Sequence, residues 1–307
     1  MKVKFINKNT TYIYIFIIFF IFLVYFLFFN IHKKSLLNKI ENYSNNNNNN
    51  RICCIYTYYE KNEKYLDNLT YFIENGINEN IDYIIVVNGK CSLDLKNKFI
   101  NTNNVNIVYR KNIGFDFGSY CYVINNILKK KYIYYFFINT SVKGPYLENR
   151  INKDWTIPFI ELFNKDDIKV VGTSINIFSP CDSDRKILKK LYGDKTVYSH
   201  VQSMFFCIKD DYLEFLKNEG FFNCEETNSM NMNTIIIRKE VGISQIALNN
   251  GWNINCILQK YKGLDYRNIY SDINNTSLSG DPYIKNGYFS NSIDKNEVIF
   301  FKNNRGF

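Results

Sequence analysis

Beyond residue 50, short apolar runs alternate with segments in which apolar residues recur at the spacing of a helix. The runs predict strands at Ile52–Tyr58, Tyr83–Val87, Val105–Tyr109 and Tyr132–Ile138. The helical spacing predicts helices between them, at Leu66–Ile77, Leu93–Ile100 and Cys121–Leu128. Strands and helices in this alternating order are typical of an α/β fold. We therefore predict a mostly parallel, Rossmann-like sheet with helices on both faces.

The pattern is weaker in the second half of the chain. Strands are predicted at Ile168–Gly172 and Met204–Ile208, and helices at Trp155–Phe163, Tyr212–Lys217 and Arg238–Asn250. After about Tyr270 the chain is rich in Asn, Ser and Gly, and only Val298–Phe301 is apolar enough to pack. We therefore predict a folded domain at residues 51–265 and a C-terminal extension at residues 266–307.

The N-terminal part has a different composition. Residues 11–29 carry no charge and follow a short tail of residues 1–10; their length is just enough for a helix to span a bilayer. No small-residue cleavage site follows, so the pattern predicts a retained transmembrane signal anchor in contact with lipid. Residues 30–50 end in an unbroken run of Asn, which indicates a flexible stem. Lysines flank the apolar run on both sides, so charge does not fix its orientation.

Charge and cysteine content argue against a nucleic-acid partner and against a zinc site. The net charge of +9 comes from scattered lysines without a dense basic block, so no nucleic-acid partner is predicted. The eight cysteines form no Cys-x-x-Cys pair, which argues against a zinc site, although their even number permits disulfides. Asn68-Leu-Thr70 and Asn275-Thr-Ser277 match the glycosylation pattern, which matters only if the domain is luminal.

Polar residues follow each of the first four predicted strands. The carboxyl ends of parallel strands meet at one edge of a sheet, where ligands bind. The third strand leads into Arg110–Tyr120, a corner in which Gly114 and Gly118 let the backbone turn tightly and approach a ligand. Free N–H groups of the following helix and the guanidinium of Arg110 are suited to phosphate. Asp116 can cap that helix, or bind a sugar hydroxyl or a metal ion.

Several motifs resemble those of known glycosyltransferases. Asn112-Ile-Gly114 after a strand, and an apolar strand that ends at Asn139-Thr-Ser141, are placed as in the GT-A fold of nucleotide-sugar transferases. The runs Arg110-x-Asn-x-Gly-x-Asp-Phe-Gly and Phe-Ile-Asn-Thr-Ser-Val-Lys-Gly-Pro more closely resemble glycosyltransferases related to rhamnan synthesis protein F. The segments Val171-Gly-Thr, His200-Val-Gln-Ser203 and Glu240-x-x-x-Ser-Gln245 are similar to that group as well, so the resemblance covers about residues 51–258.

The resemblance implies a membrane-anchored enzyme that moves a hexosyl or deoxyhexosyl group from a nucleotide-sugar donor to a glycan or lipid-linked acceptor such as a glycolipid. It also implies a domain in the lumen of the Golgi or ER. The alternative is a membrane protein that binds a sugar or nucleotide on a degenerate GT-A scaffold without turnover.

The resemblance also assigns residues to roles. Asp116 and Glu240 are the candidate catalytic residues, Glu240 as the base that takes the acceptor's proton. His200 and Gln202 would contact the acceptor or the diphosphate. The donor would be bound by Thr57, Tyr58, Asn88, Arg110, Asn112, Gly114, Gly118, Asn139, Ser141 and Lys143. Simpler interpretations remain open: capping of the loops by their polar residues, and a helix N-terminal position for Glu240 that favours the macrodipole.

One departure from the GT-A pattern concerns Mn²⁺ or Mg²⁺. GT-A enzymes usually hold Asp-x-Asp where this chain has Asn139-Thr140-Ser141, and Asn and Ser by themselves form a poor site for a divalent cation. Three explanations follow from the sequence. Asp116 supplies the missing carboxylate, or Arg110 and Lys143 neutralise the diphosphate without a metal ion, or catalysis has been lost.

Overall fold

The protein was analysed as a computed structural model that describes Phe19, Phe20, Leu23, Val24 and Phe26, residues 52–148, Arg150 and residues 153–303. The chain divides into two units, Met1–Asn50 and Arg51–Phe307.

In the first unit the five described residues are helical. Within the part of the chain that the structure describes, no helix is both long and apolar enough to cross a membrane. Most of the predicted anchor at residues 11–29, the tail before it and the stem at residues 30–50 lie outside the described residues.

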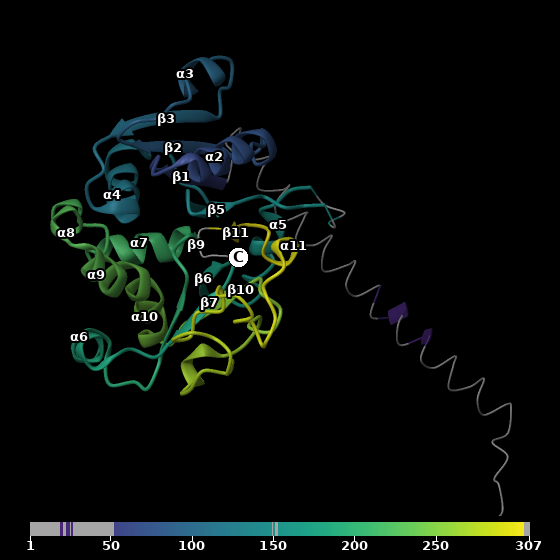
Figure 1. Cartoon of the computed structure of the whole chain (residues 1–307), viewed down its shortest axis with the longest axis vertical. Helices are drawn as coiled ribbons and strands as arrows, with labels where there is room; N and C mark the ends of the chain where they lie inside the picture. Colours follow the sequence, from purple (N-terminus) through teal and green to yellow (C-terminus); the bar gives the residue numbers. More distant parts are fainter. Residues whose placement is uncertain are drawn as a thin grey trace, which may run out of the picture. The chain divides into compact units, whose positions relative to one another are not determined.

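The second unit is built on a mixed sheet whose strands are mostly parallel (Figure 1). Within the described residues its order is β10-β6-β9-β4-β1-β2-β3, and β9 runs antiparallel to both of its neighbours. The strands span β1 Ile52–Tyr58, β2 Asp82–Asn88, β3 Val105–Arg110, β4 Tyr134–Asn139, β6 Ile168–Gly172, β9 Phe205–Lys209 and β10 Asn253–Cys256. The predicted α/β fold with a mostly parallel sheet is therefore confirmed.

Helices and short strands complete this unit. The α-helices span α2 Glu63–Asn75, α3 Leu95–Lys98, α4 Phe115–Tyr122, α5 Ile157–Ile160, α6 Asp182–Tyr192, α7 Asp210–Asn218, α8 Cys224–Ser229, α9 Met232–Ile235, α10 Gly242–Asn249 and α11 Lys295–Val298. Two π-helical segments, η1 Val123–Ile127 and η2 Ile236–Val241, continue α4 and α9, and η3 Tyr266–Asn268 is a 3₁₀ turn. Two small antiparallel pairs join β5 Val142–Lys143 to β11 Phe301–Lys302, and β7 Ile175–Phe178 to β8 Tyr198–Val201.

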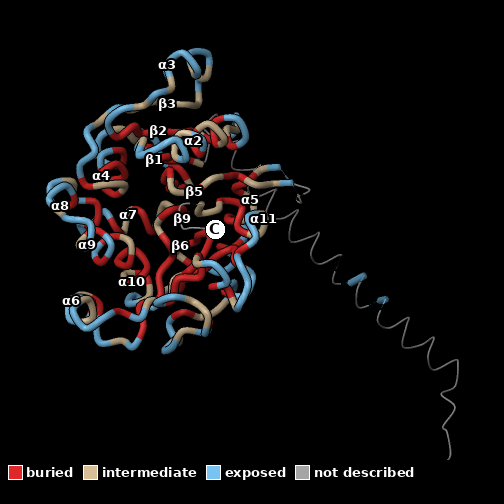
Figure 2. Tube along the Cα trace, in the orientation of Figure 1, coloured by how far each residue is buried: buried red, intermediate tan, exposed pale blue. Residues whose placement is uncertain are grey.

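Consecutive aromatic residues of the central strands pack on opposite faces of the sheet. On one face Phe136 of β4 makes an edge contact with Trp155. On the same face Tyr56 of β1 stacks on a phenylalanine of α2. On the other face Phe137 makes an edge contact with Tyr120 of α4. Figure 2 shows the central strands as buried, whereas α6 and α8 carry much of the exposed surface. Helices therefore cover both faces, and the contact with β4 holds α4 close to the end of β3.

Residues 266–303 form few regular elements but pack into the same unit. Phe300 stacks on Phe205 of β9 with ring centroids 4.7 Å apart, and Tyr283 is fully buried. Strand β11 pairs with β5, immediately after the end of β4, so the end of the described chain returns to the centre of the sheet edge (Figure 1). Residues 266–303, which were predicted as part of an extension, are thus packed into the folded unit.

Two expectations about covalent chemistry change with the structure. All eight cysteine thiols are free, and no disulfide links them. Asn68 of the first glycosylation motif is fully buried and donates hydrogen bonds to Thr140 O and Asn303 Oδ1, so its amide is not accessible to an oligosaccharyltransferase. Asn275 of the second motif is exposed.

Candidate functional site

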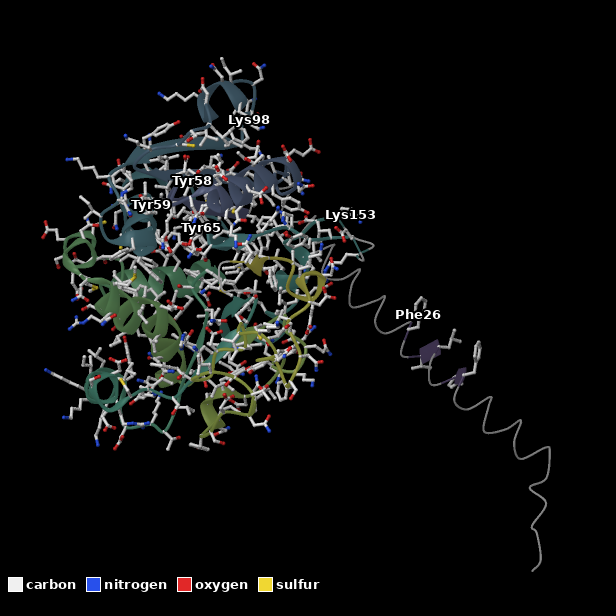
Figure 3. All side chains as sticks on the ribbon, in the orientation of Figure 1. Phe26, Tyr58, Tyr59, Tyr65, Lys98 and Lys153 are labelled. Carbon is white, nitrogen blue, oxygen red and sulfur yellow. The ribbon has the colours of Figure 1, made fainter. Side chains whose placement is uncertain are left out.

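Two adjoining cavities of about 400 and 330 Å³ open at the edge of the sheet where β4 ends. They share a wall whose polar members are Asp116, Asn139, Ser141, Ser203 and Glu240. The first cavity extends toward Tyr59, Lys61, Tyr65 and Asn112; Figure 3 labels the two tyrosines. The second cavity extends toward His200, Gln202, Asp281 and Lys302. The carboxylates of Asp116 and Glu240 therefore lie between a tyrosine-lined half and a half lined by a histidine and a lysine.

The predicted strand-to-helix corner forms this wall. Gly114, the N-cap, has φ 71°, and Phe115, the first residue of α4, has φ 54°, so both have a positive φ where the helix begins. A Cβ on Gly118 would lie 2.2 Å from Ile113 O, so the corner packs too closely for any side chain there. Gly114 occupies the N-cap position of α4 without a side-chain hydrogen bond, so no side chain caps the first-turn N–H groups, and Phe115, Asp116 and Phe117 of this turn line the first cavity.

Asp116 is not the N-cap of α4, which removes the simplest structural interpretation of this residue. Its carboxylate lies in the first turn and accepts a hydrogen bond from Asn139 Nδ2 at 2.7 Å. Burial raises the pKa of Asp116 to about 6; the charge of Glu240 adds to this, while Asn139 and Lys302 oppose it. Near neutral pH the cavity thus holds a partly desolvated carboxylate that is close to its titration point, as is common at functional sites.

Glu240 lies within the π-helical segment η2, in the middle of a continuous helical run from α9 to α10. A π-segment displaces side chains from regular helical positions and is frequent at functional sites. Glu240 Oε1 accepts a hydrogen bond from Ser203 N at 3.5 Å. The sequence interpretation of Glu240 as a residue that opens a helix is therefore wrong, and its place in the shared wall is not explained by a helix terminus.

His200 of β8 is buried in the second cavity. Its Nδ1 lies 3.1 Å from Tyr198 O, and a carbonyl can only accept, so Nδ1 carries the proton of the neutral ring. Nε2 is then the acceptor of the ring. Burial lowers the pKa of His200, although the charge of Glu240 opposes this, so the neutral form prevails at pH 7. Gln202 follows on the same edge and is held by Ser174 Oγ and Asp281.

Other residues predicted to bind the donor lie behind the wall, in the scaffold. Arg110 donates to Asn88 Oδ1 at 3.0 Å, to Ser119 Oγ at 3.0 Å and to Ile113 O at 2.8 Å. These bonds join the ends of β2 and β3 to α4. Arg110 does not line either cavity, so it is not placed to bind a phosphate group in them.

Three further predicted residues also have partners outside the cavities. Thr57 O accepts hydrogen bonds from the backbone and hydroxyl groups of Thr140, and Tyr58 OH donates to Glu60 at 2.8 Å. Lys143, the second predicted cation, forms an ion pair with Asp67 at 2.7 Å. Of the predicted polar contacts, the structure gathers Asn112, Asp116, Asn139, Ser141, His200, Gln202 and Glu240 around the cavities.

Lys302 lines the second cavity and was not identified from the sequence. Its strand β11 pairs in register with Val142, just after the predicted site loop, and this contact links residues 160 positions apart. The available signal was the apolar run that ends at Phe301, which indicated a packed segment but not its partner. Tyr59, Lys61 and Tyr65 were missed as well, because no motif marks them.

No protein-family model and no curated protein matches the chain. Solved structures similar to it include two mannosyltransferases. The mannosyltransferase PcManGT from Pyrobaculum calidifontis, in complex with GDP-Man and Mn²⁺, has a TM-score of 0.38 and 9% identity over 69% of this chain and 53% of its own. Ktr4p from S. cerevisiae has a TM-score of 0.39 and 13% identity over 64% and 65%. TarS 1-349 from S. aureus has a TM-score of 0.39 and 12% identity over 65% and 56%. The chain thus spans little more than half of PcManGT and TarS, and similarities this weak carry no argument about activity.

The residues of the shared wall do not fit a divalent metal ion. Ser141 N can only donate, and it lies 2.9 Å from Asn139 Oδ1, which fixes the orientation of the Asn139 amide. The group that Asn139 turns to Asp116 is therefore its NH₂, which cannot ligate a cation. Within the described residues, no group of three or more His, Cys, Asp or Glu side chains is arranged to hold a metal ion. A lysine next to the two carboxylates further disfavours a second cation.

Proposed function

We propose that this protein is a glycosyltransferase that moves a sugar from a nucleotide-sugar donor to a hydroxyl group of a glycan or lipid-linked acceptor. The observation that carries the proposal is the shared wall: two carboxylates, Asp116 and Glu240, meet beside the uncapped N-terminus of α4 between two cavities. One cavity can take the nucleotide and the other the acceptor, with the sugar between them. Two adjoining cavities suit transfer, because donor and acceptor must be held next to each other at one reacting carbon.

The first cavity suits the donor. Tyr59 and Tyr65 offer aromatic faces to a base, and Lys61 a positive charge. The first turn of α4 lines the same cavity, and its N–H groups, which no side chain caps, are suited to the diphosphate. Asp116, held by Asn139, can accept hydrogen bonds from sugar hydroxyls at the boundary between the two cavities.

The second cavity supplies the proton acceptor. During transfer the bond between the anomeric carbon and the diphosphate oxygen breaks, and its electron pair stays with the diphosphate. The acceptor oxygen forms the new bond and gives its proton to Glu240. The backbone N–H of Ser203 helps to orient that carboxylate. His200 Nε2 lines the same cavity and is the second candidate for this proton.

Finer parts of the proposal rest on sequence alone. The motifs quoted above support membership of the group related to rhamnan synthesis protein F and transfer of a hexosyl or deoxyhexosyl group. The uncharged residues 11–29 support a single-pass anchor, with the domain in the lumen of the Golgi or ER. Asn275 is the accessible reporter of this topology: a glycosidase-sensitive size shift that is lost in Asn275→Gln supports it, and full protease digestion of the domain in sealed microsomes contradicts it.

The proposal is tested by incubating the full-length protein with a panel of nucleotide sugars and measuring release of nucleoside diphosphate with and without candidate acceptors. Glu240→Gln should reduce release roughly a hundredfold or more, the usual effect of losing a general base. Glu214→Gln, an equivalent change at a surface residue of α7, should leave release unchanged. Binding of a nucleotide sugar without release by the wild-type protein would instead favour the non-catalytic alternative.

A further inference from the structure

We propose that the C-terminal strand β11 completes a metal-independent diphosphate-binding site, in which Lys302 supplies the positive charge that stabilises the leaving nucleoside diphosphate. This inference deepens the proposed transfer reaction and rests on it.

The position of Lys302 is the first argument. Its side chain lines the second cavity beside the two carboxylates of the shared wall. The electrostatic interactions of its ammonium with Asp116 and Glu240 are favourable. Lys302 thus lines the second cavity only, but its charge acts on Asp116 and Glu240, which belong to the wall that both cavities share.

The ammonium of Lys302 is available to a ligand. The residue is half-buried, and desolvation lowers the pKa of its ammonium, while both carboxylates act in the opposite direction. Among the residues that the structure describes, the ammonium of Lys302 has no ion-pair or hydrogen-bond partner, while its backbone pairs with Val142 of β5. Its charge is therefore not taken up by a contact partner. A desolvated ammonium with free N–H groups binds phosphate oxygens more strongly than an exposed one, because water screens it less.

The strand that carries Lys302 is firmly attached. The next residue, Asn303, exchanges two side-chain hydrogen bonds with Asn68 of α2, at 3.1 and 2.8 Å. Asn68 also donates to Thr140 O at 2.8 Å, in the loop that carries Asn139. One buried amide thus ties β11 to the site loop, so Lys302 and Asn139 are positioned by the same contact. Such pre-organisation is what stabilisation of a developing charge requires.

Other cations are worse placed for this role. Arg110 is used by three hydrogen bonds within the scaffold, and Lys143 by its ion pair with Asp67. The wall does not fit a metal ion, because Asn139 turns its NH₂ group to Asp116. Lys61 lines the first cavity but is exposed, so water screens its charge, whereas Lys302 is half-buried beside the two carboxylates. When the sugar leaves, negative charge accumulates on the diphosphate oxygens, and the ammonium of Lys302 and the uncapped N–H groups of α4 are already in place to receive it.

The test measures binding of UDP and GDP to the full-length protein by calorimetry in excess EDTA, and release of nucleoside diphosphate from the donor under the same conditions. Wild-type protein should bind one of the two nucleotides and turn over without added metal. Lys302→Met keeps the length of the chain and removes the charge; it should weaken binding roughly ten- to a hundredfold, the range of a lost charge-assisted hydrogen bond. Lys302→Arg keeps the charge and should recover part of the affinity.

Two controls make the result specific. Lys285→Met removes one positive charge from an exposed position of the same C-terminal segment, so it should change neither affinity nor turnover. Thermal unfolding of each variant separates loss of a ligand contact from loss of the fold. Since binding is measured without a sugar or an acceptor, it remains informative even if no donor is turned over.

Two results would overturn the inference. One is binding that disappears in EDTA and returns with Mn²⁺; the other is a folded Lys302→Met variant with wild-type affinity for the nucleotide. Failure of the transfer reaction gives a different pattern, in which wild-type protein binds the nucleotide in EDTA, Lys302→Met does not, and no donor is consumed.

Discussion

Replacement of Asp116 by Asn should make the protein more stable and less active at the same time. The substitution keeps the shape of the side chain, and the new amide oxygen can still accept the hydrogen bond from Asn139. What is removed is a charge that the fold holds in a partly desolvated place next to Glu240. A group that serves packing or capping alone would not show this combination.

The magnitude follows from the pKa of Asp116, which burial raises from 3.8 to about 6. Two pK units correspond to about 3 kcal/mol at most, and solvent in the cavity reduces this to roughly 1–2 kcal/mol. Because the folded state holds the proton more tightly than the unfolded state, the ionised carboxylate destabilises the fold above pH 6. This cost disappears as the pH falls toward 4. The gain of the Asn variant should therefore be present at pH 8, roughly 2–6 °C in melting temperature, and absent at pH 4.

Thermal melts of wild-type protein and Asp116→Asn at pH 8 and pH 4, each paired with a donor-turnover assay, check this prediction. Equal stability at both pH values would show that the carboxylate is not desolvated, and full activity would remove Asp116 from the reaction.

Three further substitutions test the scaffold. Gly118→Ala should destabilise the protein by about 1–3 kcal/mol in chemical unfolding, because its Cβ would collide with Ile113 O; a neutral result would mean that the corner relaxes freely. Arg110→Ala should cost about 1–3 kcal/mol through the polar groups that it leaves unpaired, yet the variant that remains folded should bind nucleoside diphosphate normally. Loss of nucleotide affinity without loss of stability would restore Arg110 as a phosphate ligand. Asn68→Ala should cost on the order of 3 kcal/mol and also weaken nucleotide binding, because it releases β11; wild-type affinity would show that β11 is held by other contacts.

The first half of the fold was predictable because its signals are local. Strand β1 was predicted with its observed bounds, and β2, β3 and β4 within about two residues at each end. Their apolar runs are buried on both faces of the sheet, which is the case in which sequence composition is most informative. Helix α4 was predicted to start too late, since the glycines of the corner hide its first turn.

The rest of the site depends on contacts that no local pattern encodes. The β7–β8 pair, which carries His200, consists of four-residue strands without clear alternation, and it was not predicted. Lys302 reaches the cavity only because β11 pairs with β5 across the whole length of the domain. The sequence named Asp116, Asn139 and Glu240, which the structure brings into one wall, and one of its three explanations used Arg110 and Lys143 as cations, neither of which lines the cavities.

The central claim is that a nucleotide sugar reacts between Asp116 and Glu240 without a metal ion. The most direct measurement is a crystal structure of the full-length protein, grown in EDTA with the nucleoside diphosphate that the donor screen identifies. The account predicts the diphosphate at the N-terminus of α4, with its oxygens within hydrogen-bonding distance of Lys302 Nζ and the base near Tyr59 and Tyr65. A nucleotide that binds elsewhere, or that binds only with Mn²⁺ coordinated by Asp116, would contradict it.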